Sequence, residues 1–146
     1  LEIGFENGVS AVAILYCQPS ATLISVDIRS EIKGIKYLFN SPYKDRHTFI
    51  KSWSSKFWEN NSDIYDLIYI DGDHSFNGCS KDIHEAWDVL EQGGHLVIDD
   101  TSHVANNSGG YGCAAASLQL IEKYQHEIEA IYMSGRLLVI RKCENE

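Results

Sequence analysis

The sequence predicts an α/β fold built on an open, doubly wound sheet of mostly parallel strands. Two observations carry this prediction. Short and nearly continuous apolar runs such as "TLISV", "DLIYI" and "HLVI" recur along the chain, as is typical of buried parallel strands. Most of these runs are followed by a polar or glycine-bearing turn and then by a helical pattern. Strands that alternate with helices in this way join one sheet through helical crossovers.

The predicted elements alternate along the whole chain. They are strand 1–4, helix 8–17, strand 22–27, helix 30–40, strand 47–51, helix 53–60, strand 65–71, helix 78–91, strand 94–99, helix 112–126, and strands near 128–133 and 137–142. Residues 1–146 are expected to form one domain, because this length and a 44% hydrophobic content suffice for a single core. The chain starts at Leu1 inside the first predicted strand, so we expect an N-terminal segment of the natural protein to be missing.

The helix predicted at 78–91 lies between two buried strands. Ile83, Ala86 and Leu90 recur at spacings of three and four, which places them on one helical face. The pair Gly93-Gly94 is expected to end this helix before the next strand begins. A helix between two buried strands indicates a parallel crossover unit.

The last helix and the two final strands have a different pattern. Leu118, Ile121 and Ile128 are expected to form the apolar stripe of helix 112–126. The last two strands are joined at Ser134-Gly135, a turn that favours a β-hairpin. The C-terminal part of the sheet is therefore expected to be antiparallel.

The composition excludes several classes of partner. The 21 acidic residues outnumber the 12 basic ones and give a formal charge of -9, which argues against nucleic acid. No apolar stretch approaches the roughly 20 residues of a membrane-spanning helix. The four cysteines show neither CxxC nor zinc-type spacing, which favours reduced thiols in a cytoplasmic protein.

In doubly wound sheets, ligands bind beyond the carboxyl ends of the strands. After the first strand, "LEIGFENGVS" offers Gly4 and Gly8 for a tight turn, and Asp27 ends the next strand. An acid about 20 residues after such a loop can accept both hydroxyls of a ribose, which indicates an adenosine-containing cofactor. A nicotinamide dinucleotide fits poorly, because Glu2 and Glu6 would repel its pyrophosphate. S-adenosylmethionine fits better, because it has no phosphate and a cationic end.

Four motifs in order carry a resemblance to a known family. They are "EIGxxxGxS" followed by a strand-ending Asp, then "DLIYIDGDHS", "LEQGGHLVIDDT" and a glycine-led helix. The chain resembles the class I S-adenosylmethionine-dependent methyltransferases, and is most similar to the branch with bacterial sugar O-methyltransferases and metal-dependent catechol-type O-methyltransferases. The resemblance implies a Rossmann-like, seven-stranded sheet. It also implies that Glu2, Gly4, Gly8 and Asp27 are cofactor-binding residues.

The end of the third strand departs from the family. Many relatives carry an acid there that binds the adenine amino group, whereas this chain has Trp53 in "FIKSWSS". Adenine is expected to stack on Trp53 or to bond with Ser54. The alternative interpretation is that Trp53 is a core residue that opens a helix.

Acids also follow the fourth and fifth strands. These strands are expected to be neighbours, which would bring Asp71 close to the pair Asp99-Asp100. Three crowded carboxylates repel one another unless a proton or a cation lies between them, and oxygen ligands favour Mg²⁺. The resemblance implies that Asp71, Asp99 and Asp100 hold the metal and that Asp71 also contacts the cofactor. The alternative is that these aspartates cap a turn and a helix.

The candidate general base is His74. It follows Asp71 by three residues, the spacing at which relatives carry a Lys or His base, and histidine can accept a hydroxyl proton near neutral pH. Asp73 is expected to orient a metal ligand, and Asp82 to cap or pair within its helix. His103, which follows "DDTS", is a candidate for the substrate side.

The sequence therefore predicts a Mg²⁺-dependent O-methyltransferase that acts on a small-molecule hydroxyl, such as a sugar or a diol. The oligomeric state stays open, although relatives often pair as homodimers. Two alternatives stay open. One is a metal-independent methyltransferase or a hydroxylase-like relative on the same fold, and the other is a cofactor-binding module without catalysis.

Overall fold

The computed structural model describes residues 1–29, 33–102 and 112–144. Within these residues, seven strands form one sheet in the order β3-β2-β1-β4-β5-β7-β6. The strands are β1 (Glu2–Ile3), β2 (Leu23–Asp27), β3 (His47–Lys51), β4 (Tyr65–Ile70), β5 (Leu90–Ile98), β6 (Ile128–Ser134) and β7 (Leu137–Lys142). The helices are α1 (Val9–Cys17), α2 (Lys33–Phe39), α3 (Ser54–Trp58), α4 (Phe76–Asp88) and α5 (Gly112–Tyr124), with a 3₁₀ turn at Lys44–Arg46.

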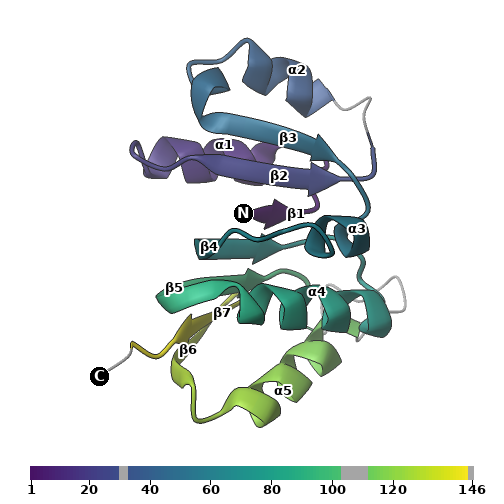
Figure 1. The fold of residues 1–146 in the computed structure, drawn as a ribbon, viewed down its shortest axis with the longest axis vertical. Helices are drawn as coiled ribbons and strands as arrows, with labels where there is room; N and C mark the ends of the chain where they lie inside the picture. Colours follow the sequence, from purple (N-terminus) through teal and green to yellow (C-terminus); the bar gives the residue numbers. More distant parts are fainter. Residues whose placement is uncertain (30–32, 103–111, 145–146) are drawn as a thin grey trace.

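The sheet is Rossmann-like and mostly parallel, as the sequence predicted. Strands β3, β2, β1, β4 and β5 pair in parallel, whereas β7 pairs antiparallel with both β5 and β6. Figure 1 shows β1 in the middle, between β2 and β4. The chain crosses from one half of the sheet to the other beside β1, so the carboxyl ends of β1, β2, β4 and β5 lie at one edge.

Two separate apolar clusters cover the two faces of this sheet. The smaller cluster joins Phe5 and Leu23 to Leu15 of α1 and Leu38 of α2. The larger cluster lies on the other face, where α4 packs over β4 and β5 and against α5. Because side chains alternate along a strand, Leu23 of β2 belongs to the smaller cluster, whereas the next residue, Ile24, packs against the larger one. A doubly wound sheet requires this two-sided core.

The helix predicted at 78–91 is shifted in the structure. Helix α4 ends at Asp88, and β5 already begins at Leu90, which pairs with Tyr65. Gly93, with φ 76°, and Gly94 therefore lie inside a strand, where the register against β4 shifts. The prediction that the two glycines end the helix was wrong, because a bulged strand uses glycine in the same way as a helix terminus does.

The apolar stripe predicted for the last helix was also partly wrong. Leu118 is 68% exposed, and Ile128 belongs to β6. The buried face of α5 consists of small residues together with Leu120, because α5 packs closely on α4. The predicted hairpin is confirmed, with Ser134 opposite Leu137. The start of the helix predicted at 30–40 lies outside the described residues.

In the described ranges, none of the helices is both long and apolar enough to cross a membrane.

Candidate cofactor pocket and acidic site

The glycine loop after β1 brings the first and fourth strand ends into contact. Gly4 has φ 90°, and a Cβ atom at this position would lie 2.0 Å from the carbonyl oxygen of Asp71. Only glycine tolerates both this backbone conformation and this approach. Gly8, with φ 73°, precedes α1, and a Cβ there would lie 2.6 Å from the ring of Phe5. These two glycines therefore let the loop between β1 and α1 pack closely against Asp71 and Phe5.

Five of the predicted cofactor residues line one cavity of about 270 Å³. They are Gly4, Asp27, Trp53, Ser54 and Asp71. Trp53 directly precedes α3, and its side chain is 68% exposed. The alternative interpretation of Trp53 as a core residue is therefore wrong, and its indole offers an aromatic surface at the cavity.

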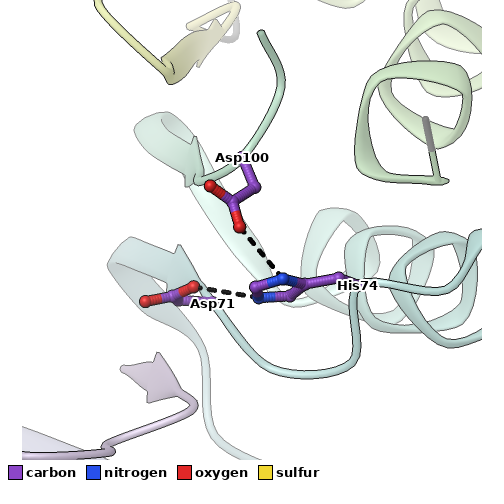
Figure 2. Close-up of side chains that lie close together, drawn as sticks. All are labelled: Asp71, His74 and Asp100. Carbon is purple, nitrogen blue, oxygen red and sulfur yellow. Dashed lines mark hydrogen bonds and ion pairs between the residues drawn. The ribbon is translucent and has the colours of Figure 1, made fainter. Parts of the chain in front are cut away.

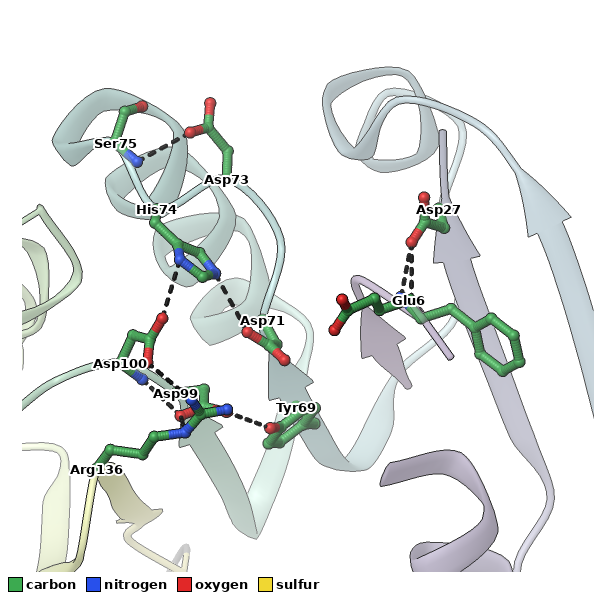
Figure 3. A network of polar contacts seen from close by, with 11 residues as sticks. Glu6, Asp27, Tyr69, Asp71, Asp73, His74, Ser75, Asp99, Asp100 and Arg136 are labelled. Atoms are coloured by element: carbon green, nitrogen blue, oxygen red, sulfur yellow. Dashed lines mark hydrogen bonds and ion pairs between the residues drawn. The ribbon is translucent and has the colours of Figure 1, made fainter. Parts of the chain in front are cut away.

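Asp27 is held by the glycine loop itself. Its carboxylate accepts hydrogen bonds from the backbone amides of Phe5 and Glu6, both at 3.0 Å, and of Arg29 at 2.8 Å. Burial of Asp27 disfavours its charge, but these amides and the Arg29 guanidinium outweigh burial and lower the pKa of Asp27. The side chain is therefore a stable anion that ties the end of β2 to the loop (Figure 3).

Glu2 lies beneath the loop and is absent from the residues that line the cavity. Its side chain is fully buried, and it accepts hydrogen bonds from the hydroxyls of Ser10 in α1 and Ser25 in β2. Desolvation raises the pKa of Glu2 to about 7, although the two hydroxyls act in the opposite direction. In the described structure Glu2 therefore supports α1 and β2 from behind the pocket.

Glu2→Gln is expected to remove a pH dependence of stability. Because the folded-state pKa lies above the usual 4.5, the folded protein binds the proton more tightly, and this stabilisation is lost as the pH rises from 4.5 through 7. A shift of this size corresponds to about 3 kcal/mol of unfolding free energy. Denaturant unfolding at pH 5 and pH 8 should show that the wild type weakens more than Glu2→Gln. The exposed Glu122→Gln serves as control, and an unchanged pH slope in Glu2→Gln would contradict the burial argument.

The second part of the site is an acidic cluster at the ends of β4 and β5. Figure 2 shows the ring of His74 between two carboxylates. Its Nδ1 lies 2.9 Å from Oδ2 of Asp100, and its Nε2 lies 3.2 Å from Oδ1 of Asp71. Asp100 has φ 55°, a left-handed conformation that is rare outside glycine and common at functional sites. The structure thus brings together three of the predicted residues, two from the loop after β4 and one from the segment after β5.

The imidazole of His74 cannot satisfy both neighbouring carboxylates by itself. Desolvation, followed by the nearby Asp99 carboxylate, raises the pKa of Asp71 to about 6, against the opposing effect of His74. A neutral imidazole can donate a hydrogen bond through only one nitrogen, so His74 cannot satisfy both carboxylates without an extra proton. A proton or a cation between the groups would relieve this conflict.

Asp99 points away from this cluster, toward two other partners (Figure 3). It is buried and accepts hydrogen bonds from the hydroxyl of Tyr69 and from the guanidinium of Arg136, both at 2.8 Å. Burial and the bond to Asp99 raise the pKa of Tyr69. Sequence reasoning missed Arg136, because it lies in a hairpin 37 residues away from Asp99, and no motif marks it.

The two secondary candidates have structural contacts. Asp73 accepts a hydrogen bond from the backbone amide of Ser75, the residue that caps α4. Asp82 is buried and accepts a hydrogen bond at 2.9 Å from the indole of Trp58 in α3. The prediction that Asp82 pairs within its own helix was therefore wrong. His103 lies outside the described residues.

The residues fit both predicted ligands. The cavity is lined by the exposed indole of Trp53, by the carboxylate of Asp27, which can accept a further hydrogen bond, and by Gly4. This lining suits an adenosine group. Donor atoms of Asp71, His74 and Asp100 lie within 4.8 Å of one another, and this spacing suits one metal ion. Among the described residues, Oδ1 of Asp100 accepts no hydrogen bond, although Nη1 of Arg136 lies 3.3 Å away.

The strand order, the glycine loop after β1 and the cavity beyond the strand ends define a class I S-adenosylmethionine-dependent methyltransferase fold. The chain belongs to the methyltransferase-domain family, whose model matches residues 1–101. No curated protein matches the sequence.

Many solved structures share the fold, and three of them illustrate the similarity. MycE methyltransferase from the mycinamycin biosynthetic pathway, in complex with Mg and SAH, has a TM-score of 0.73 and 16% identity over 99% of this chain and 45% of MycE. Cofactor-bound Rv0187 from MTB has a TM-score of 0.78 and 18% identity, over 99% of this chain and 72% of that one. The O-methyltransferase from Bacillus cereus, in complex with SAH, has a TM-score of 0.71 and 15% identity, over 97% and 72%. The chain thus spans less than half the length of MycE.

Proposed function

We propose that this protein is a Mg²⁺-dependent O-methyltransferase that methylates a hydroxyl of a small molecule, such as a sugar or a diol. The observation that carries the proposal is the position of His74, between the carboxylates of Asp71 and Asp100. Asp71 also lines the cavity with Gly4 and Asp27. Asp71 therefore belongs both to the proposed cation site and to the proposed cofactor pocket, and it lies in contact with the proposed proton acceptor, His74.

Each part of the site has a separate task. Gly4 and Asp27 would hold S-adenosylmethionine, with Trp53 against the adenine, and this cofactor supplies an electrophilic methyl group. Asp71 and Asp100 would hold Mg²⁺, which lowers the pKa of a hydroxyl and orients it. His74 accepts the proton of the acceptor hydroxyl at a ring nitrogen. The loop between β1 and α1 positions the two reactants, which supplies much of the rate enhancement.

The ligands bound in two of the similar structures support this proposal. MycE binds Mg and SAH in its crystal, and the Bacillus cereus O-methyltransferase binds SAH. The net charge of -9 favours a neutral or cationic acceptor over nucleic acid.

Calorimetry and a turnover assay test the proposal together. The purified protein should bind S-adenosylmethionine and SAH, and it should release SAH when mixed with a panel of sugars and vicinal diols in Mg²⁺. A chelator should reduce turnover by about tenfold or more. Turnover that the chelator leaves unchanged would favour the metal-independent route. Cofactor binding without turnover on any acceptor would favour the binding module, and incorporation of oxygen into the acceptor would favour a hydroxylase.

A further inference from the structure

The tip of the β6–β7 hairpin inserts an arginine into the acidic site. The backbone carbonyl of Arg136 accepts hydrogen bonds from the amide of Thr101 at 3.0 Å and from its hydroxyl at 2.8 Å. These two bonds fasten the hairpin to the segment that follows β5. The guanidinium is thereby directed at the two aspartates that end this strand (Figure 3).

Arg136 contacts Asp99 through two nitrogens. Its Nε lies 2.7 Å from Oδ1, and its second terminal nitrogen lies 2.8 Å from Oδ2. This two-point contact is the strongest geometry for an arginine and a carboxylate. Asp100 is touched less closely, at 3.3 Å.

The accepting capacity of Asp99 is used up by these contacts and two others. Oδ1 also accepts the backbone amide of Asp100 at 2.6 Å, and Oδ2 also accepts the hydroxyl of Tyr69 at 2.8 Å. A carboxylate has about four accepting positions, and all four have partners here. A metal ion that used Asp99 would have to displace at least one buried hydrogen bond.

The net charge of the site agrees with a metal ion that is held without Asp99. Asp71, Asp99 and Asp100 together carry three negative charges when ionised, and Arg136 contributes one positive charge. The remaining two negative charges equal the charge of one divalent ion. The donor atoms that lie within 4.8 Å of one another come from Asp71, His74 and Asp100, and Asp99 does not belong to this group.

We propose that Arg136 is a positioning residue that withholds Asp99 from the metal and matches the charge of the site to a divalent ion. Asp99 then acts as the anchor of Arg136, and the ion is held through Asp71 and Asp100. This inference rests on the metal site of the proposed function. It differs from the metal set expected from the sequence, in which Asp99 is itself a ligand.

Titration calorimetry with Mn²⁺ and La³⁺ tests the role of Arg136. Arg136→Met should bind Mn²⁺ about tenfold more tightly than the wild type does, because a competing positive charge is gone, and La³⁺ should gain more than Mn²⁺ does. Arg136→Lys keeps the charge and should stay within about threefold of the wild type. Unchanged or weaker binding in Arg136→Met, or equal behaviour of the Met and Lys variants, would overturn the proposal.

A charge-balanced double variant tests the role of Asp99. Asp99→Asn combined with Arg136→Met removes one charge of each sign, so Mn²⁺ affinity should stay within about threefold of the wild type. A loss of about tenfold or more would show that Asp99 is a ligand and would overturn the proposal. Thermal melts verify folding. If the double variant does not fold, the Arg136→Met and Arg136→Lys variants still test the proposal.

Titration of the wild type shows whether the proposed metal site or only the role of Arg136 is wrong. If the wild type binds neither ion, the metal part of the proposed function is wrong, and this inference falls with it. If the wild type binds Mn²⁺ and the variants behave otherwise than stated, only the role of Arg136 is wrong.

Discussion

Asp71→Asn is expected to lower the rate of methyl transfer by about a hundredfold or more, and to make the remaining activity insensitive to Mg²⁺. Asp71 is the one residue among those described that both lines the cavity proposed for the cofactor and belongs to the acidic cluster. Asparagine keeps its shape but removes the charge that would hold the ion. The measurement is SAH release at saturating S-adenosylmethionine, with Mg²⁺ or with chelator.

The same substitution should leave the fold intact, and this separates catalysis from stability. Because the folded-state pKa of Asp71 is raised to about 6 from 3.8, the wild type loses unfolding free energy as the pH rises from about 4 to about 6. Asp71→Asn lacks this loss, so in chelator at pH 8 it should be as stable as the wild type or more so. Asp88→Asn, on the exposed end of α4, is the matched control. An Asp71→Asn enzyme with full, chelator-sensitive activity would contradict the proposed metal site.

His74→Gln is expected to lower kcat by about a hundredfold or more, while the affinity for S-adenosylmethionine stays within about threefold. Glutamine can still donate a hydrogen bond to a neighbouring carboxylate, but it cannot accept a proton from a hydroxyl at neutral pH. His74 is not among the residues that line the cavity, so cofactor binding should persist. Pre-steady-state methyl transfer and calorimetry give the two quantities separately.

A matched histidine variant separates the role of His74 from a general effect of removing an imidazole. His126→Gln, on an exposed surface, is the control and should keep the wild-type kcat. If His74→Gln retains the wild-type kcat, another group is the base.

Local patterns in the sequence were sufficient to predict most elements of the fold. Apolar runs and turn residues located all seven strands, and the Ser134-Gly135 turn predicted the hairpin that the structure contains. The errors occurred where one local signal fits two structures. Gly93-Gly94 can end a helix or bulge a strand, and only the pairing of Leu90 with Tyr65 decided between them.

The candidate site was predictable to the extent that it depends on strand ends. In a parallel sheet the carboxyl ends share one edge, so adjacent strands β4 and β5 bring Asp71 and Asp100 to the same ring of His74. The orientation of individual side chains was not predictable in this way. Asp99 and Asp100 are neighbours in sequence and both contact Arg136, yet only Asp100 contacts His74 and only Asp99 contacts Tyr69.

Periodicity, turns and charges act over short stretches of chain, so the sequence was sufficient to predict the class of fold, the edge of the sheet that holds the candidate site and the residue types there. Which distant side chains meet follows only from the tertiary structure. It placed Arg136 on Asp99, the indole of Trp58 on Asp82, and Glu2 beneath the loop rather than in the pocket. These contacts join residues from 23 to 37 positions apart, and they depend on strand order and packing, which no local pattern encodes.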